Sequence, residues 1–200
     1  FSVRFIDFRY LLVNYSFHTE RGYLPIIYGR LVAPHILSEF DRIIYLDSDL
    51  IMNCDVRELY EIDLKDNFIA GVRDLPMIAW GSIKDHEEYK NLNRLRLSDK
   101  ENYINSGVLV FNNRIFNQTF PVQFLLNYAT SRKWRWMDQD VLNKLCDGKI
   151  LLLPQEYNVL LSLRKDDEIL RTSNLTELIS EYKKAMEHPK ILHYISCSFK

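Results

Sequence analysis

Short apolar segments with strand character alternate along this chain with segments of helical periodicity. Strands are expected at residues 3–13, 42–46, 67–72, 103–111, 149–153 and 190–194. Helices are expected at residues 24–39, 55–61, 113–131, 138–147 and 174–187. Residues 3–13 also suit a helix, and the polar stretch 76–102 is expected to be an irregular surface excursion with one short helix. The alternation predicts an α/β fold with a largely parallel sheet.

Length, charge and cysteine content narrow the class of protein. The 200 residues carry a net charge of -1 and contain no repeat or flexible linker. One domain over residues 1–200 is therefore expected, and the charge balance argues against a nucleic-acid partner. Cys54, Cys146 and Cys197 lack metal-binding spacing and favour a reducing compartment, whereas three Asn-x-Ser/Thr triplets would permit a secretory one.

Two acidic residues stand where the strand at 42–46 ends. Asp47 and Asp49 are two positions apart, so in an extended chain their side chains share one face. Carboxylate oxygens are the ligands that Mg²⁺ and Mn²⁺ prefer, and ligands of open α/β sheets gather at the carboxyl ends of strands. The pair predicts a metal site, and a solvated turn is the alternative.

Three further polar clusters follow or enter apolar segments. They are Asn105-Ser106-Gly107, Asp138-Gln139-Asp140 and His193-Tyr194. A neutral imidazole can complete a carboxylate metal site, and His193 is the best-placed histidine, although a lone histidine is more often structural. The acidic cluster equally suits the first turn of a helix, where the helix dipole favours negative charge.

Five motifs in order resemble one enzyme family. They are Tyr28-x-Arg30-Leu31, the segment 44–49 (IYLDSD), the segment 103–109 (YINSGVL), the segment 138–143 (DQDVLN) and His193-Tyr194. Together they resemble glycosyltransferase family 8, which includes glycogenin and bacterial lipopolysaccharide galactosyl- and glucosyltransferases. The resemblance covers roughly residues 23–195 and implies a Rossmann-like nucleotide-diphospho-sugar transferase fold of the GT-A type.

The resemblance also implies a donor, a metal ion and roles for individual residues. The donor would be a UDP-sugar, transferred with retention of configuration and with Mn²⁺, or alternatively Mg²⁺, as cofactor. The implied metal ligands are Asp47, Asp49 and His193. The residues implied to surround the donor are Arg30, Asp47, Ser48, Asp49, Asp74, Asn105, Ser106, Asp138 and Gln139.

Asp138 and Gln139 are the residues expected to act in catalysis. The resemblance puts both under the donor sugar, with Gln139 near the reactive face of the anomeric carbon. A bound metal ion would neutralise the departing diphosphate, and carboxylate or amide oxygens would stabilise an oxocarbenium-like centre. Same-face attack by the acceptor hydroxyl is the preferred mechanism, because amides are poor nucleophiles. Double displacement through Asp138 is the alternative.

Both ends of the chain depart from the family pattern. The strand and helix that hold the nucleoside in the family would precede residue 1, so N-terminal truncation is expected, either as a fragment or as a natural short form. Ser196 replaces a glycine of the family's last motif, and Lys200 lies one position too far for its diphosphate-binding lysine. A shortened, non-catalytic binding or assembly module is thus the alternative function.

Partners and compartment are expected from the same resemblance. The partners would be a UDP-hexose donor and a glycan, glycolipid or glycoprotein acceptor, with self-association covering an exposed sheet edge. The compartment would be the cytoplasm or the periphery of the inner membrane in a bacterium, and the Golgi lumen in a eukaryote.

Overall fold

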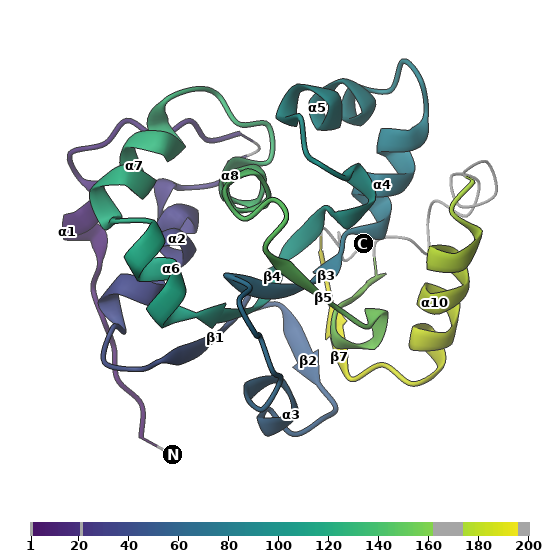
Figure 1. The fold of residues 1–200 in the computed structure, drawn as a ribbon, viewed down its shortest axis with the longest axis horizontal. Coiled ribbons are helices and arrows are strands. Elements are labelled where there is room, and N and C mark those ends of the chain that lie inside the picture. The colour runs from purple at the N-terminus through teal and green to yellow at the C-terminus, as the bar shows by residue number, and fades with distance from the viewer. Residues whose placement is uncertain (1, 21, 162–173, 196–200) are drawn as a thin grey trace.

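The computed structural model describes residues 2–20, 22–161 and 174–195, and a four-stranded sheet lies at its centre (Figure 1). In spatial order, its strands are β1 (Arg42–Leu46), β4 (Ile104–Asn112), β3 (Ile69–Arg73) and β5 (Ile150–Leu153). The longest strand, β4, is antiparallel to both β1 and β3, and only β3 and β5 run parallel. The α/β class is confirmed, but the largely parallel sheet is wrong for the described strands.

A smaller sheet joins the segment after β1 to the end of the described chain. It consists of β2 (Leu50–Met52), β7 (Ile191–His193) and β6 (Val159–Leu160), with β2 antiparallel and β6 parallel to β7. Leu50 pairs with His193 in this register. The pairing therefore brings His193 next to the acidic residues that precede β2.

The helices around β1 and β4 follow the expected positions with one interruption. The turn η1 (Pro25–Tyr28) leads into α2 (Gly29–Ile36), and α6 (Asn113–Thr119), α7 (Val122–Thr130) and α8 (Met137–Leu145) follow β4. The single helix expected at 113–131 is wrong, because Pro121 stands between α6 and α7. Proline cannot donate a backbone hydrogen bond to a continuing helix. Figure 1 shows α2, α6 and α7 on one side of the molecule, with α8 viewed down its axis between them and α5.

The stretch 76–102 is not an irregular excursion. It forms α4 (Leu75–Ser82), α5 (Glu87–Leu95) and the turn η2 (Lys100–Asn102), and α4 packs against α5. Most of α4 is buried, because its apolar residues face the core rather than solvent. The charged residues of the segment lie on α5 and in the turns on either side of it.

The strand expected at 3–13 is also wrong. Its only regular element is the one-turn helix α1 (Arg9–Leu12), whose Leu12 packs with Val32 and Leu126. The remaining described elements are α3 (Arg57–Tyr60), η3 (Gln155–Tyr157) and α10 (Thr176–Glu187). No described helix has the length and apolar character needed to cross a membrane.

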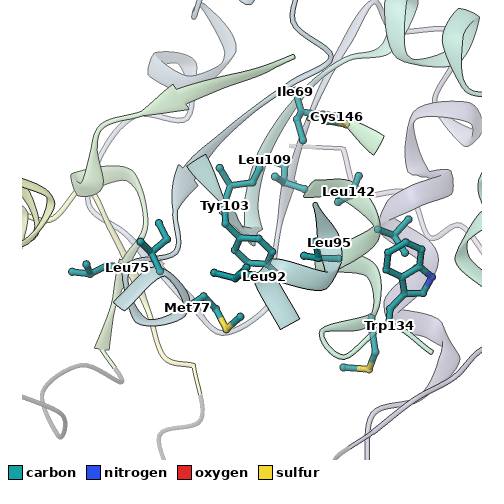
Figure 2. Packing of buried hydrophobic residues seen from close by; sticks show 14 of the residues in the cluster. Ile69, Leu75, Met77, Leu92, Leu95, Tyr103, Leu109, Trp134, Leu142 and Cys146 are labelled. Atoms are coloured by element: carbon teal, nitrogen blue, oxygen red, sulfur yellow. The ribbon is translucent and has the colours of Figure 1, made fainter. Parts of the chain in front are cut away.

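The main core lies between β4, β3 and the helices α4, α5 and α8 (Figure 2). Tyr103, Leu109, Leu142 and Trp134 are among its buried side chains. Because α8 is buried along most of its length, the polar residues of its first turn are held in the interior as well. The core thus positions one end of α8 beside the end of β1.

Candidate active site

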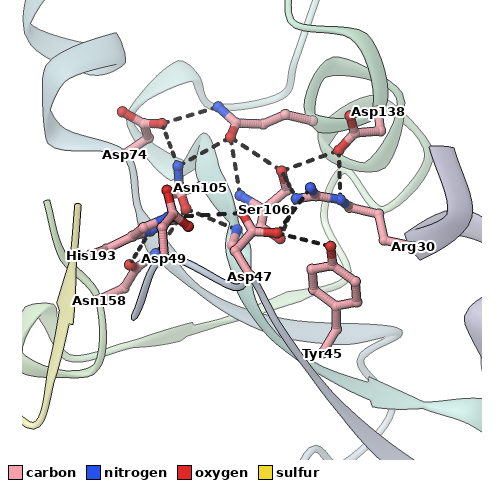
Figure 3. Close-up of polar contacts among 12 residues, drawn as sticks. Arg30, Tyr45, Asp47, Asp49, Asp74, Asn105, Ser106, Asp138, Asn158 and His193 are labelled. Carbon is pink, nitrogen blue, oxygen red and sulfur yellow. Dashed lines mark hydrogen bonds and ion pairs between the residues drawn. The ribbon is translucent and has the colours of Figure 1, made fainter. Parts of the chain in front are cut away.

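Asp47, Asp49 and His193 come together beside the small sheet. His193 Nε2 lies 3.2 Å from Asp49 Oδ1 and 3.8 Å from Asp47 Oδ2 (Figure 3). One potential ligand atom from each residue lies within 4.8 Å of the others, close enough for the three residues to share one metal ion. Two carboxylates and one imidazole form a donor set suited to Mn²⁺ or Mg²⁺.

Asn158 controls which ring nitrogen of His193 faces the carboxylates. Asn158 Nδ2 donates to Asn105 Oδ1 at 2.9 Å, so its Oδ1 is the atom 2.9 Å from His193 Nδ1. Nδ1 is therefore the protonated nitrogen, and the Nε2 lone pair faces Asp47 and Asp49. Burial lowers the pKa of His193, which also favours the neutral ring. A neutral imidazole held by an outer hydrogen bond is the form that ligates metals.

Gly107 allows the metal-ligand cluster to pack against β4. A Cβ atom at this position would overlap the His193 ring and lie 2.8 Å from Asp47 Oδ2. The backbone carbonyl of Gly107 also accepts a hydrogen bond from Asp47 N at 2.8 Å. Only glycine leaves room for this close approach without displacing a ligand.

Arg30 links the metal-ligand cluster to the first turn of α8. Its Nη2 lies 3.0 Å from Asp47 Oδ1 and its Nε 3.0 Å from Asp138 Oδ2, while Nη1 donates to the Ser106 carbonyl oxygen and hydroxyl at 2.7 Å each. Tyr45 donates to Asp47 Oδ1 at 2.8 Å. Burial disfavours the charged guanidinium, but the two carboxylates outweigh it and raise the pKa of Arg30.

Asp138 has an unusual protonation equilibrium for a carboxyl group. Burial raises its pKa to about 6, although Arg30 acts in the opposite direction. Ser106 donates to Asp138 Oδ2 at 3.3 Å. The carboxyl group therefore changes its protonation state close to neutral pH, as titratable groups of active sites often do.

Gln139 is fixed by hydrogen bonds at both ends of its amide. Its Oε1 accepts from Ser106 N at 3.0 Å and Asn105 Nδ2 at 3.2 Å, and its Nε2 donates to Asp74 Oδ2 at 3.0 Å. Asp74 in turn caps α4 by accepting from Met77 N at 3.0 Å, and burial raises its pKa. The amide therefore presents its oxygen toward β4, and partners on β4 and at the start of α4 set its orientation.

These residues line a cavity of about 1290 Å³. Ser48 lies between the two acidic residues on its wall, and Trp80 and Trp136 form part of another wall. Buried Glu88 accepts from Trp136 Nε1 at 2.7 Å and from Arg135 Nε at 2.8 Å, which fixes the indole. The volume exceeds the ~300–1,000 Å³ of most small-molecule pockets, so it can hold a large polar ligand or two ligands.

The structure brings the whole predicted site together. Arg30, Asp47, Ser48, Asp49, Asp74, Asn105, Ser106, Asp138, Gln139 and His193 all line the cavity, and their individual roles stay predictions. Lys200 and Cys197 lie outside the described residues.

Sequence reasoning missed several residues that line the cavity or hold its side chains in place. These are Tyr45, Asn158, Glu88 and Trp136, together with the spatial role of Gly107. The sequence gives one indication of Asn158: this amide side chain directly precedes the two apolar residues that form β6. In the sequence, nothing distinguishes Glu88 from the charged residues expected on the exposed face of a helix.

Comparison with known proteins agrees with the geometry. The model of glycosyl transferase family 8 matches residues 3–200. The chain is 29% identical over 161 residues to the lipopolysaccharide 1,2-glucosyltransferase of Escherichia coli (strain K12), covering 78% of this chain and 44% of that protein. The chain spans less than half the length of the first curated relatives that it matches.

Two solved structures share the fold. The bifunctional glycosyltransferase WbbM, in its apo form, has a TM-score of 0.77 at 24% identity, covering 89% of this chain and 33% of that one. The galactosyltransferase LgtC, solved with donor and acceptor sugar analogues, has a TM-score of 0.67 at 21% identity, covering 94% and 64%. These similarities confirm the Rossmann-like GT-A architecture. Since the family model matches almost every residue, the chain belongs to glycosyltransferase family 8.

Proposed function

We propose that this chain carries the catalytic centre of a retaining hexosyltransferase that uses a UDP-sugar donor and Mn²⁺. The observation that carries the proposal is the convergence of Asp47, Asp49 and His193 beside Arg30 and Asp138 in one cavity. The neutral His193 and the two carboxylates fit a hard divalent ion, with Mg²⁺ as the alternative. When bound, the ion supplies positive charge next to a departing diphosphate.

Arg30 and the first turn of α8 have complementary tasks in this mechanism. Arg30 holds Asp138 and Asp47 in fixed positions, and its guanidinium adds positive charge where phosphate oxygens would lie. The oxygens of Asp138 and Gln139 provide negative potential for a positively charged anomeric carbon. Asp138 is a weakened nucleophile because Arg30 pairs with it, which favours same-face attack by the acceptor over double displacement.

A glycan, glycolipid or lipopolysaccharide acceptor fits the remaining space of the cavity. Trp80 and Trp136 present aromatic surface there, and aromatic rings suit the apolar faces of sugars. The similarity to a lipopolysaccharide glucosyltransferase supports the same class of acceptor. The compartment that we propose is the cytoplasm or the periphery of the inner membrane in a bacterium, and the Golgi lumen in a eukaryote.

The experiment is donor hydrolysis by the full chain with Mn²⁺ and either UDP-glucose or UDP-galactose. Asp47→Asn and Asp49→Asn are expected to lower UDP release by about 10²-fold or more, since each removes a charged ligand. Asp66→Asn is the control, because Asp66 is an exposed acid paired with Lys149 on the surface. Release that is unaffected by the first two variants would overturn the metal assignment.

The same experiment addresses a shortened, non-catalytic module. A chain that binds neither Mn²⁺ nor UDP, while circular dichroism shows it folded, would support that alternative. A chain that binds both and releases UDP supports transferase chemistry.

A further inference from the structure

A second pocket lies at the opposite end of α8 from Asp138 and Gln139. Its volume is about 720 Å³, and residues from the end of α5, the segment after α7 and the end of α8 line it. Asp138 and Lys144 mark the two ends, about 9 Å apart along the helix axis. The pocket shares no lining residue with the active-site cavity.

Four cationic side chains gather in this pocket. They are Arg94, Arg96, Arg132 and Lys144. The whole chain has a net charge of -1, so the concentration of positive charge is local. Lys144 lies 3.6 Å from Asp147, but within the described part of the chain no ion pair with a carboxylate is formed by the three arginines. Their charge is therefore largely uncompensated by neighbouring side chains.

Two of the arginines are held by contacts that leave their charge available. Arg94 donates to the neutral Asn91 Oδ1 at 3.3 Å, and the Arg132 guanidinium lies 3.7 Å from the centre of the Trp134 ring. Arg94, Arg96 and Arg132 are all exposed to solvent. A guanidinium presents several N–H groups in a planar fork that matches phosphate oxygens, so such a group of arginines suits a phosphate.

Helix-end stabilisation is the competing explanation. Cations are favourable at helix C-termini, and α5, α7 and α8 all end near this pocket. Lys144 meets this description, because its Nζ donates to the Arg96 carbonyl oxygen at 2.8 Å. The Arg132 guanidinium instead lies over the Trp134 ring. The concave shape and the arginine side chains thus require a further explanation.

We propose that this pocket binds a phosphate group. The phosphate is carried either by a free phosphorylated saccharide or by the headgroup of an anionic lipid, and the chemistry of recognition is the same for both. Binding there does not depend on the sugar-transfer reaction, because the two sites have separate linings.

The test follows the Trp134 indole N–H signal and the arginine side-chain signals by NMR during titration with inorganic phosphate. Arg96→Gln with Arg132→Gln is expected to weaken binding about tenfold, the effect of losing two charge-assisted contacts at exposed positions. Lys183→Gln with Lys184→Gln is the matched control, because both lysines are exposed on α10 and the charge change is equal. The control is expected to bind phosphate as the wild type does.

A second arm distinguishes the two sources of phosphate. Sedimentation with phosphatidylglycerol vesicles, compared with phosphatidylcholine vesicles, measures headgroup binding by wild type and both double variants. Vesicle binding that is lost only in the arginine variant assigns a lipid headgroup, and phosphate binding without vesicle binding assigns a soluble ligand. Equal phosphate affinity in both double variants would overturn the proposal. A second result would also overturn it: no phosphate-induced shifts in the wild type, together with a lower unfolding midpoint in the arginine variant. That combination would mean that the cations stabilise the helix ends.

Discussion

At the scale of single residues, the geometry of Asp47, Asp49 and His193 depends on neighbouring residues that are not themselves metal ligands. Asn158 fixes the tautomer of His193, and Gly107 leaves the space in which His193 and Asp47 lie. The sequence motifs predicted the acidic and imidazole groups, because those residue types carry the chemistry. They did not predict Asn158, whose role arises only from its distance to His193.

Replacing Asn158 with alanine is expected to weaken Mn²⁺ binding about 10- to 100-fold, because outer hydrogen-bond partners of ligating histidines contribute on that order. Without Asn158, the His193 ring is free to place its proton on Nε2. Isothermal titration with Mn²⁺ measures the effect. Asn102→Ala, at an exposed position in η2, is the control and should bind like wild type. Unchanged Mn²⁺ affinity in Asn158→Ala would contradict the assigned tautomer.

Gly107→Ala is expected to reduce Mn²⁺ binding while the fold persists. The added Cβ atom forces either the His193 ring or the Asp47 carboxylate to move. Gly148→Ala provides the contrast: its φ of +77° strains any side chain, but nothing lies within 4 Å of the added atom. This second variant should lower the unfolding temperature without changing Mn²⁺ affinity. Mn²⁺ titration and thermal unfolding on both proteins separate the two effects.

At the scale of elements, strands flanked by polar residues were predictable, and so was the three-residue β7 within the strand expected at 190–194, but the short strands β2 and β6 were not. The strand expected at 42–46 coincides with β1, and the strand expected at 103–111 differs from β4 by one residue at each end. The strands β2 and β6 have three and two residues, too few to show a periodicity. The stretch 76–102 is polar as a whole, so the short apolar helix α4 at its start was not predicted.

The hydroxyl of Tyr103, the residue directly before β4, bonds to α8, and its removal tests that connection. Tyr103 donates to Asp140 Oδ1 at 2.7 Å, and both residues are buried. Tyr103→Phe is expected to lower the free energy of unfolding by about 1–3 kcal/mol, because a buried carboxylate loses a donor. Tyr60→Phe, at an exposed position in α3, should have little effect. Urea denaturation provides the measurement.

The loss in Tyr103→Phe should also depend on pH. Burial raises the pKa of Asp140, and the Tyr103 hydrogen bond opposes that shift, so removing the hydroxyl raises this pKa further. A carboxyl with a raised folded-state pKa binds its proton more tightly when folded, and stability falls as pH rises through that range. The deficit should therefore be larger at about pH 8 than at about pH 4. An equal deficit at both values would show that Asp140 does not sense the hydroxyl.

At the scale of the whole molecule, strand direction was the property that sequence pattern could not supply. Alternating strands and helices favour a parallel sheet in general, yet β4 runs antiparallel to both of its neighbours. The segment between β3 and β4 contains α4 and α5, which pack against each other, and no local pattern in it records the direction of β4. In the described part of the sheet, β1 has one strand neighbour, so the expected self-association at its other edge stays a prediction.

The pairing of β2 with β7 has a consequence for the order in which the molecule opens. It joins chain positions 50 and 193, so a metal ion shared by Asp47, Asp49 and His193 acts as a cross-link between segments far apart in sequence. Such a cross-link closes the long loop between these positions and stabilises the pairing of β2 with β7, which must break before the loop can open. Mn²⁺ should therefore slow amide hydrogen exchange in β7 and α10 more than in β3, and Asp49→Asn should abolish the difference. Equal slowing throughout the molecule would mean that β7 never detaches before the central sheet unfolds.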